Sequence, residues 1–244
     1  MIDFRLGRYQ DVLQDVTCDA VICDPPYSER VHAGHFAGCT DEKTDSGWLE
    51  RTGYDDKRSR RRPLNYQFWT NEDAKSFVNY WDNKCNGWMV VITDHILQTA
   101  FSDAMSDVGR YVFAPLPFVE VGKCARLNGD GPASWTCWVV VSRPKDIKYS
   151  KWGHIRGAYI FNKGAVEQVK TVVGGKPEQL MTTIIRDYSK PGDLICDPCA
   201  GGATTLIAAA SQGRRSVGAE MDADTYAKAM QRIKAGYTTD MFVA

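Results

Sequence analysis

The chain has 244 residues, of which 43% are hydrophobic and 25% are charged, which is enough length for one large domain or two small ones. Its 30 Lys and Arg residues are balanced by 30 Asp and Glu residues, and this balance excludes a uniformly basic coat for nucleic acid. No apolar run approaches the roughly 20 residues of a membrane helix. The first residues, MIDFRLGRYQ, lack the apolar centre of a secretory signal. We therefore expect a cytoplasmic protein that does not associate with a membrane.

Short apolar runs alternate with segments in which apolar side chains recur at helical spacing. The expected strands, in chain order, are residues 20–23, 88–92, 111–113, 118–121, 135–141, 193–196 and 216–220. The expected helices are residues 72–83, 96–105, 178–188, 204–212 and 225–235. This alternation predicts an open α/β sheet of buried parallel strands, with an antiparallel pair formed around the turn at 129–132.

Two long stretches, residues 28–65 and 142–175, show no periodicity, and loops of that length are usually functional or disordered. The first contains five basic residues within six positions: Lys57, Arg58, Arg60, Arg61 and Arg62. Such a cluster suits contacts with phosphates, although a solvated loop explains it equally well. The second contains lysines between 145 and 151 followed by Trp152 and His154, a further candidate for nucleic-acid contact.

The eight cysteines are expected to be reduced thiols, several of them packed as small apolar groups inside strands. Cys196 and Cys199 form one CxxC pair, and a zinc site of this kind would need a second pair. His32, His35 and Cys39 lack a fourth ligand at a suitable spacing. The sequence therefore predicts no metal site.

A glycine-rich turn, Asp197-Pro198-Cys199-Ala200-Gly201-Gly202, separates an expected strand from an expected helix. Glycines let the main chain approach a ligand closely, and the helix N-terminus offers free N–H groups. About 20 residues later, Glu220 ends another strand, at the spacing typical of a carboxylate that binds ribose hydroxyls. These features indicate a site for an adenosine-containing cofactor; the alternative is an ordinary glycine-rich turn with a surface Glu.

The tetrapeptide Asp24-Pro25-Pro26-Tyr27 follows the first apolar run. The prolines fix the backbone and leave free carbonyl acceptors. Asp24 and the Pro25 carbonyl suit the two N–H groups of a planar amine, and Tyr27 can stack on its ring. Two acceptors would localise the amine lone pair toward a methyl donor. An ordinary proline turn is the alternative interpretation.

DPPY and DPCAGGATT together resemble motifs of the DNA amino-methyltransferases, which methylate adenine N6 or cytosine N4 with S-adenosylmethionine. The order of the motifs, with Lys176-Pro177-Glu178-Gln179-Leu180 before the cofactor strand, is similar to the β group of that family. The resemblance implies a Rossmann-like fold with a seven-stranded, mostly parallel sheet that has one reversed strand. It implies one methyltransferase domain over residues 1–244, with residues 28–65 and 142–175 as DNA-contacting insertions.

Carried over by position, the resemblance implies two sets of site residues. The catalytic residues would be Asp24, Pro25, Pro26 and Tyr27. The residues around S-adenosylmethionine would be Lys176, Asp197, Pro198, Ala200, Gly201, Gly202, Thr204, Thr205 and Glu220.

Several positions depart from the family pattern. Cys199 and Ala203 stand where the usual cofactor loop has a bulky residue and a glycine. Arg8 follows Gly7 where relatives often carry an Asp that faces the cofactor adenine. Pro198-Cys199 resembles the nucleophile of cytosine carbon-5 methyltransferases, but it lies inside the cofactor loop and a separate DPPY is present.

The implied substrate is double-stranded DNA from which the target base is flipped, at a cost that stacking on Tyr27 would partly offset. An Asp in the first position of the tetrapeptide is commoner for adenine than for cytosine. Cytosine N4, RNA or free nucleotides as substrates, and a non-catalytic nucleic-acid-binding subunit, stay open as alternatives. A homodimer and a restriction-modification partner are also open.

Overall fold

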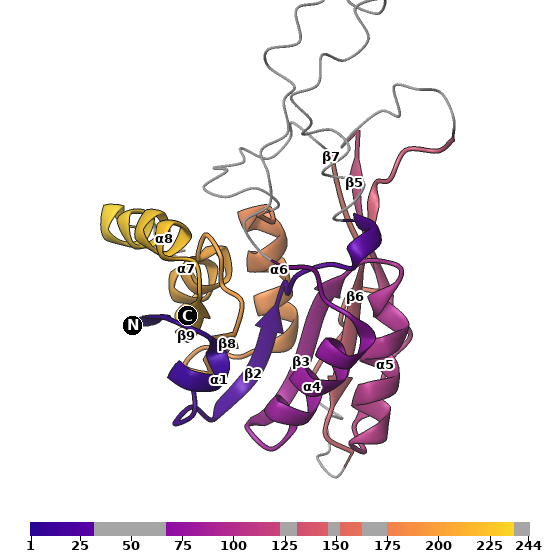
Figure 1. Cartoon of the computed structure of the whole chain (residues 1–244), viewed down its shortest axis with the longest axis horizontal. Coiled ribbons are helices and arrows are strands. Elements are labelled where there is room, and N and C mark those ends of the chain that lie inside the picture. The colour runs from indigo at the N-terminus through magenta and orange to yellow at the C-terminus, as the bar shows by residue number, and fades with distance from the viewer. Residues whose placement is uncertain (32–66, 123–130, 146–151, 163–174, 237–244) are drawn as a thin grey trace, which may run out of the picture.

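The computed structural model describes residues 1–31, 67–122, 131–145, 152–162 and 175–236 (Figure 1). The strands are β1 (Ile2–Leu6), β2 (Cys18–Cys23), β3 (Cys85–Thr93), β4 (Tyr111–Val112), β5 (Leu116–Val121), β6 (Thr136–Arg143), β7 (Tyr159–Asn162), β8 (Leu194–Asp197) and β9 (Arg215–Glu220). The helices are α1 (Tyr9–Val12), α4 (Asn71–Asp82), α5 (Leu97–Asp107), α6 (Glu178–Tyr188), α7 (Thr204–Ser211) and α8 (Ala223–Ala235).

The described strands form one sheet in the order β1-β9-β8-β2-β3-β6-β5-β7, and the short β4 also pairs with β6. Within this sheet β6 alone is reversed, since it pairs antiparallel with β3, β4 and β5, whereas the other pairs are parallel. This arrangement confirms the expected mostly parallel α/β sheet with one reversed strand. The described part has nine strands rather than seven, because the edge strands β1 and β7 add to the seven that the sequence predicted.

Helices cover both faces of the sheet because successive strand residues point to opposite sides. On one face, Val21 and Cys23 pack with α4 and α5 through Phe77, Trp81 and Phe101. On the other face, Ala20 and Ile22 belong to the cluster that contains the apolar stripes of α6 and α7. Both layers are visible in Figure 1, where α4 and α5 lie on the opposite side of β2 and β3 from α6 and α7.

Local sequence signals explain where several helices begin. Thr70 and Asp73 form a reciprocal capping box at the start of α4, in which the Thr70 hydroxyl accepts from the Asp73 N–H and the Asp73 carboxylate accepts from the Thr70 N–H. Asp222 accepts from the Thr225 N–H at the start of α8.

No helix of the described residues is long and apolar enough to cross a membrane.

The expectation that residues 142–175 are irregular was wrong at two places. Ser142 and Arg143 end β6, and residues 159–162 form β7, which pairs with β5. β7 has four residues on the edge of the sheet, and among them only Tyr159 is buried. A run this short with one buried side chain has no periodicity that a sequence could reveal. The strand β1 at the opposite edge was also missed.

Candidate active site

The carboxyl ends of the parallel strands bring together four acidic residues that are far apart in the sequence. Asp197 ends β8 and Glu220 ends β9, while Asp24 and Asp94 directly follow β2 and β3. β2 lies between β8 and β3, with Ala20 opposite Ile195 and Val21 opposite Cys196 on one side. The two sequence motifs therefore open at the same edge of the sheet, which is where ligands bind in open α/β folds.

The end of the segment 24–27 is held by two hydrogen bonds of its backbone groups. The Tyr27 carbonyl accepts from the Trp69 N–H at 3.0 Å, and the Ser28 N–H donates to the Asp94 carboxylate at 2.7 Å. Pro25 is buried, whereas Pro26 and Tyr27 are half-buried. Burial raises the pKa of the Tyr27 hydroxyl well above its usual value, and the nearby charge of Asp24 acts in the same direction, so the phenol stays neutral.

Asp24 is bound by Lys176, a residue that the sequence interpretation assigned to the cofactor. The Lys176 Nζ donates to both carboxylate oxygens, at 2.7 Å to Oδ1 and 2.6 Å to Oδ2. The same ammonium lies 4.8 Å from the centroid of the Tyr27 ring, within the range of a cation–π contact. The structure thus places Lys176 on the DPPY segment, and none of its described contacts involves the glycine-rich turn.

The turn after β8 is tied to its neighbours by backbone bonds. The Ala200 N–H donates to the Ala219 carbonyl at 2.9 Å, and the Ala203 N–H donates to the Ala200 carbonyl at 2.7 Å. Ala203 precedes α7 with φ 60° and ψ 24°, in the left-handed region that favours glycine. The glycine of the family pattern therefore has a conformational reason, and Ala203 adopts the same backbone at the cost of local strain.

Asp197 is buried beneath this turn and accepts from the Cys199 N–H at 3.2 Å. Burial raises the pKa of Asp197 to about 7, against the opposing effects of hydrogen bonds from the Thr205 hydroxyl, the Cys199 N–H and Cys23. Asp197 and Thr205 therefore shape the turn from below. The open face of the turn is formed by Gly201, which is half-buried and has φ 49°.

Glu220 lies at the end of β9 and is half-buried. Its Oε1 accepts from the Asp222 N–H at 2.7 Å, and its backbone carbonyl accepts from the Gly7 N–H at 2.8 Å. Burial raises the pKa of the Glu220 carboxyl. Hydrogen bonds from backbone N–H groups, including that of Gly201, act in the opposite direction. A fixed carboxylate beside a glycine turn fits the ribose of an adenosine-containing cofactor, and the neighbouring Met221 offers an exposed apolar side chain for a base.

Arg232 of α8 is a site residue that the sequence interpretation missed. Its Nη1 donates to the Gly202 carbonyl at 3.0 Å and to the Thr204 hydroxyl at 2.9 Å. Its Nη2 donates to the Glu178 carboxylate at 2.7 Å. One guanidinium therefore connects the cofactor turn, the start of α6 and α8. The only sequence signal was an Arg in a helix without an obvious partner, and such a residue usually faces solvent.

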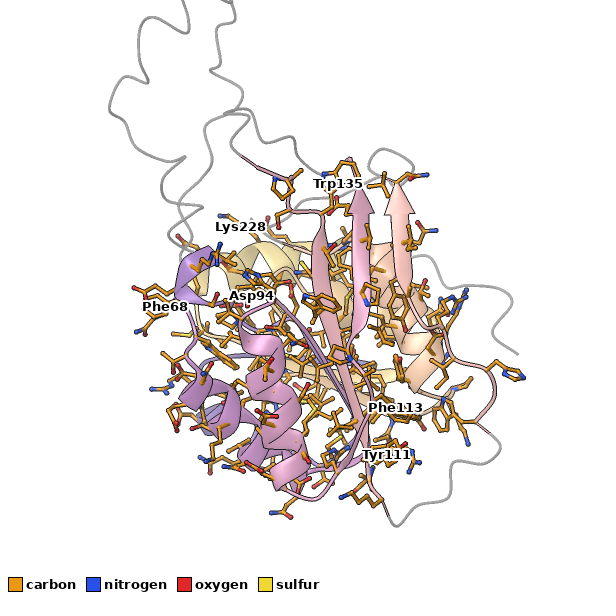
Figure 2. All side chains as sticks on the ribbon, turned by 90° about the vertical axis from the view of Figure 1, so that its right-hand side faces the viewer. Phe68, Asp94, Tyr111, Phe113, Trp135 and Lys228 are labelled. Atoms are coloured by element: carbon orange, nitrogen blue, oxygen red, sulfur yellow. The ribbon has the colours of Figure 1, made fainter. Side chains whose placement is uncertain are left out.

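Asp94 has a second structural role beyond capping. Its Oδ1 accepts from the N–H groups of Ile96 and Leu97 at 2.8 and 2.9 Å, which caps α5, and its Oδ2 accepts from the Ser28 N–H. The side chain is buried, and Figure 2 shows it at the end of α5. The bond to Ser28 fixes the backbone immediately after Tyr27.

The described cysteines behave mainly as core residues. Cys18, Cys23, Cys85, Cys137 and Cys196 are buried free thiols, and Cys199 is half-buried. Burial raises the pKa of Cys23 well above its usual value, so this thiol stays protonated. Among the described residues, no group of three or more His, Cys, Asp or Glu side chains could hold a metal ion.

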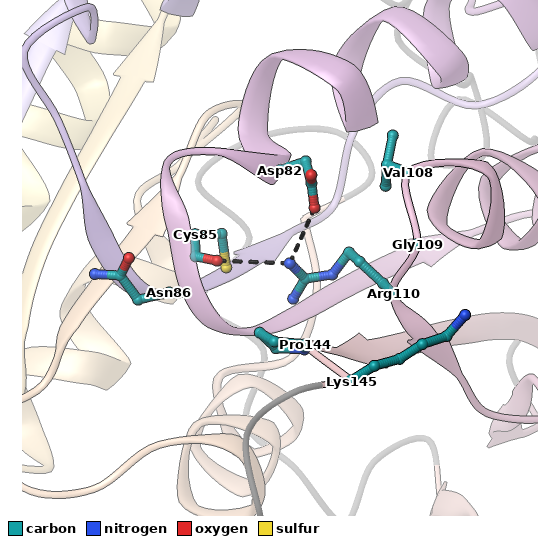
Figure 3. Close-up of a pocket in the computed structure, with 8 residues that line it drawn as sticks. All are labelled: Asp82, Cys85, Asn86, Val108, Gly109, Arg110, Pro144 and Lys145. Carbon is teal, nitrogen blue, oxygen red and sulfur yellow. Dashed lines mark hydrogen bonds and ion pairs between the residues drawn. The ribbon is translucent and has the colours of Figure 1, made fainter.

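A cavity of about 470 Å³ lies at the opposite edge of the sheet, where β3 begins (Figure 3). Arg110 dominates it, but its guanidinium already donates to Asp82, Ser142 and the carbonyls of Cys85 and Gly87. These bonds occupy the arginine with the protein's own groups. The cavity lies at the amino ends of the parallel strands and is separate from the site.

Most residues of the two basic regions lie outside the described part of the chain. Lys57, Arg58, Arg60, Arg61 and Arg62 lie outside the described residues, as do His32, His35, Cys39 and residues 146–151. Trp152, which follows the second region, donates from Nε1 to the Asp187 carbonyl at 2.7 Å and packs against Trp88. Trp152 is therefore held against α6 and the sheet.

The fold and the clustered strand ends define an α/β protein of the Rossmann-like class with a nucleotide-type site. The family model for DNA methylases, which covers the N6 and N4 enzymes, matches residues 54–231. The chain belongs to this family, and the resemblance inferred from the motifs is confirmed.

One curated relative is the DNA adenine methyltransferase YhdJ of Escherichia coli (strain K12). It is 38% identical over 58 residues, which are 24% of this chain and 20% of the relative. The matched stretch thus spans only a fifth of the length of that protein.

Solved structures of DNA methyltransferases share the fold at low sequence identity. The M1.HpyAVI-SAM complex has a TM-score of 0.67 at 18% identity, covering 96% of this chain and 99% of that chain. The PvuII DNA methyltransferase, described as cytosine-N4-specific, has a TM-score of 0.67 at 15% identity, covering 100% of this chain and 88% of that chain. These similarities confirm the Rossmann-like methyltransferase fold.

Proposed function

We propose that the chain transfers a methyl group from S-adenosylmethionine to the exocyclic amine of a base in double-stranded DNA, most favourably adenine N6. The observation that carries this proposal is the pairing of β2 with β8, which brings the DPPY segment and the glycine-rich turn to one edge of the sheet. A methyl donor and an amine must lie within contact distance for direct transfer, and adjacent parallel strands provide that proximity.

The cofactor pocket of the proposal consists of the turn at 197–202, the start of α7 and Glu220. Glu220 would accept hydrogen bonds from the ribose, while the main chain at Gly201 and Gly202 passes close to the ligand. Bound there, S-adenosylmethionine supplies an activated methyl group on a sulfonium. Asp197 and Thr205 support the turn from the buried side, where they exclude water.

The amine pocket consists of Asp24, the Pro25 carbonyl and Tyr27. An exocyclic amine is a poor nucleophile because its lone pair is delocalised into the ring. Asp24 and the carbonyl would accept its two N–H groups, so the lone pair turns toward the methyl group. Transfer would form an N–C bond as the S–C bond of the sulfonium breaks, which leaves a neutral thioether, and the Asp24 carboxylate would accept the proton that the amine loses. Tyr27 would stack on the flipped base.

Adenine is favoured by two observations. The tetrapeptide begins with Asp, and the 58-residue match is to a protein named as an adenine methyltransferase. The similar fold of a protein described as cytosine-N4-specific makes cytosine N4 the second candidate. We also propose that residues 1–244 act as one methyltransferase domain, with residues 28–65 and 142–175 contacting DNA and the Lys57–Arg62 cluster binding phosphates.

The test is to incubate the purified chain with DNA and S-adenosylmethionine labelled in the methyl group, and to digest the DNA to nucleosides. Mass spectrometry should identify N6-methyladenine. Detection of N4-methylcytosine would show that cytosine N4, the second candidate, is the target. An absence of labelled nucleosides would contradict the proposal. Sequencing of the methylated DNA then locates the modified position.

Asp24→Ala provides the matched variant for the chemistry. It should lower the rate of transfer by at least about 100-fold, because one of the two amine acceptors is lost. Calorimetry should show that S-adenosylmethionine still binds, since Asp24 is not part of the proposed cofactor pocket. Full activity of this variant would overturn the catalytic assignment.

A further inference from the structure

Lys176 contacts both Asp24 and Tyr27, the two side chains that bind the target base in the proposed function. Its ammonium binds the two Asp24 oxygens at 2.7 and 2.6 Å and lies 4.8 Å from the centroid of the Tyr27 ring. The ion pair is well shielded, with 9% of the Lys176 side chain and 22% of the Asp24 side chain exposed. An amine hydrogen-bonded to Asp24 and stacked on Tyr27 would need the same space.

The residues that follow Lys176 are held at the start of α6. Pro177 precedes α6, and its carbonyl accepts from the N–H groups of Leu180 and Met181 at 3.1 and 3.3 Å. Glu178 is paired with Arg232, which also holds Gly202 and Thr204. Glu178, two residues after Lys176, is therefore linked through Arg232 to the cofactor turn, while the four-carbon side chain of Lys176 extends to Asp24.

We propose that, in the free enzyme, the Lys176 ammonium occupies the position that the amine of the target base must take. The carboxylate of the bound cofactor withdraws this ammonium, so that the cofactor must bind before the base enters. This inference rests on the proposed function, and it assigns Lys176 to both pockets in turn. A neutral base amine cannot by itself displace the ammonium, because the displaced charge would be left partly buried without a partner. The methionine part of S-adenosylmethionine carries a carboxylate that supplies such a partner.

The first experiment compares crystal structures of the chain alone and with sinefungin, an unreactive cofactor analogue that retains the carboxylate. The Lys176–Asp24 ion pair should be present in the first structure and broken in the second. Methylthioadenosine, which lacks the amino-acid portion, should leave the pair intact. Sinefungin bound with Lys176 still on Asp24 would contradict this inference alone and leave the proposed function standing.

The second experiment measures base extrusion with duplex DNA that carries 2-aminopurine at the modified position located by sequencing. The wild-type chain should give little fluorescence increase without a cofactor and a large increase with sinefungin. Lys176→Met should extrude the base without any cofactor, with at least about a tenfold gain over the wild-type chain under the same conditions.

Lys190→Met is the matched control, because the Lys190 Nζ also lies over an aromatic ring, 4.9 Å from the centroid of Trp152, but has no described contact with Asp24. It should retain the cofactor requirement. Lys176→Gln, a smaller change in polarity, guards against a folding defect in Lys176→Met and should behave in the same way. A cofactor requirement that persists in both Lys176 variants, or that is missing from the wild-type chain, would overturn the inference.

Discussion

Gly218 illustrates how a single residue fixes the distance between two strands. It lies in β9 opposite Asp197 of β8. A Cβ atom at this position would approach the Asp197 carbonyl oxygen to 2.7 Å, the Leu206 Cδ2 to 3.0 Å and the Ala200 Cβ to 3.1 Å. Since the first contact is with backbone, the clash is not relieved by a rotation of a side chain. A glycine here lets the cofactor turn lie directly against the sheet.

We therefore predict that Gly218→Ala lowers the free energy of unfolding by about 1–3 kcal/mol. Urea denaturation followed by circular dichroism measures this change. Gly157→Ala is the control, because a Cβ at Gly157 meets nothing within 4 Å. The control should stay within about 0.5 kcal/mol of the parent chain. Equal stability of both variants would show that the turn can move away from β9.

Asp94 connects the start of α5 to the backbone that follows Tyr27. Its replacement should therefore affect both the stability of the fold and methyl transfer. Asp94→Ala removes the acceptor of three backbone N–H groups, two at the start of α5 and one at Ser28. We expect a loss of about 2–4 kcal/mol in the free energy of unfolding, combining a lost cap with unsatisfied buried donors. Methyl transfer should fall while cofactor affinity is kept.

Asp107→Ala, at the other end of α5, serves as the control for Asp94→Ala. A negative charge near a helix C-terminus opposes the helix dipole, so its removal should be neutral or slightly stabilising. Thermal or urea denaturation compares the two variants. An Asp94→Ala variant as stable as the Asp107→Ala variant would contradict the role assigned to this carboxylate.

Arg232 connects three elements, since it holds the Gly202 carbonyl and the Thr204 hydroxyl and pairs with Glu178. Without these bonds the turn at 197–204 should sample other conformations, and the fraction competent to bind the cofactor should decrease. We predict that Arg232→Ala weakens S-adenosylmethionine binding by about tenfold, which calorimetry measures. Lys228→Ala, an exposed residue of the same helix, should leave binding unchanged. Unchanged binding in Arg232→Ala would show that the turn holds its shape unaided.

Burial of Asp197 has a consequence for the stability of the whole molecule. Its pKa is raised to about 7 in the folded chain, whereas an unfolded chain has a pKa near 3.9 for Asp. Between about pH 4 and pH 7 the folded state retains a proton that the unfolded state has lost. The contribution of this carboxyl to the free energy of unfolding therefore decreases as pH rises through that window.

Asp197→Asn removes this titration and isolates its effect. Relative to Asp197→Asn, the parent chain should lose up to about 4 kcal/mol in its free energy of unfolding as the pH rises from 4 to 7. Urea denaturation at a series of pH values measures the difference. Asp103→Asn, on the exposed surface of α5, is the control for the substitution itself. A constant difference for Asp197→Asn would show that Asp197 is ionised in the folded state at low pH.

The whole molecule also shows how much the sequence could predict. The apolar runs that became β2, β3 and β8 were recognisable because strands buried on both faces consist of consecutive apolar residues. The helices α4 to α8 were recognisable by their apolar stripes, and α6 has the expected bounds. The edge strands β1 and β7 were missed because few of their side chains are buried.

The sequence alone determined the class of fold, the family and the two motifs of the site, because these depend on local periodicity and on residue types at short spacing. Only the tertiary structure decided that Lys176 contacts Asp24, that Arg232 holds the cofactor turn and that Asp94 binds the backbone after Tyr27. These contacts join residues up to 152 positions apart. Strand order and helix packing create such contacts, and periodicity along one chain carries no record of which distant side chains those arrangements bring together.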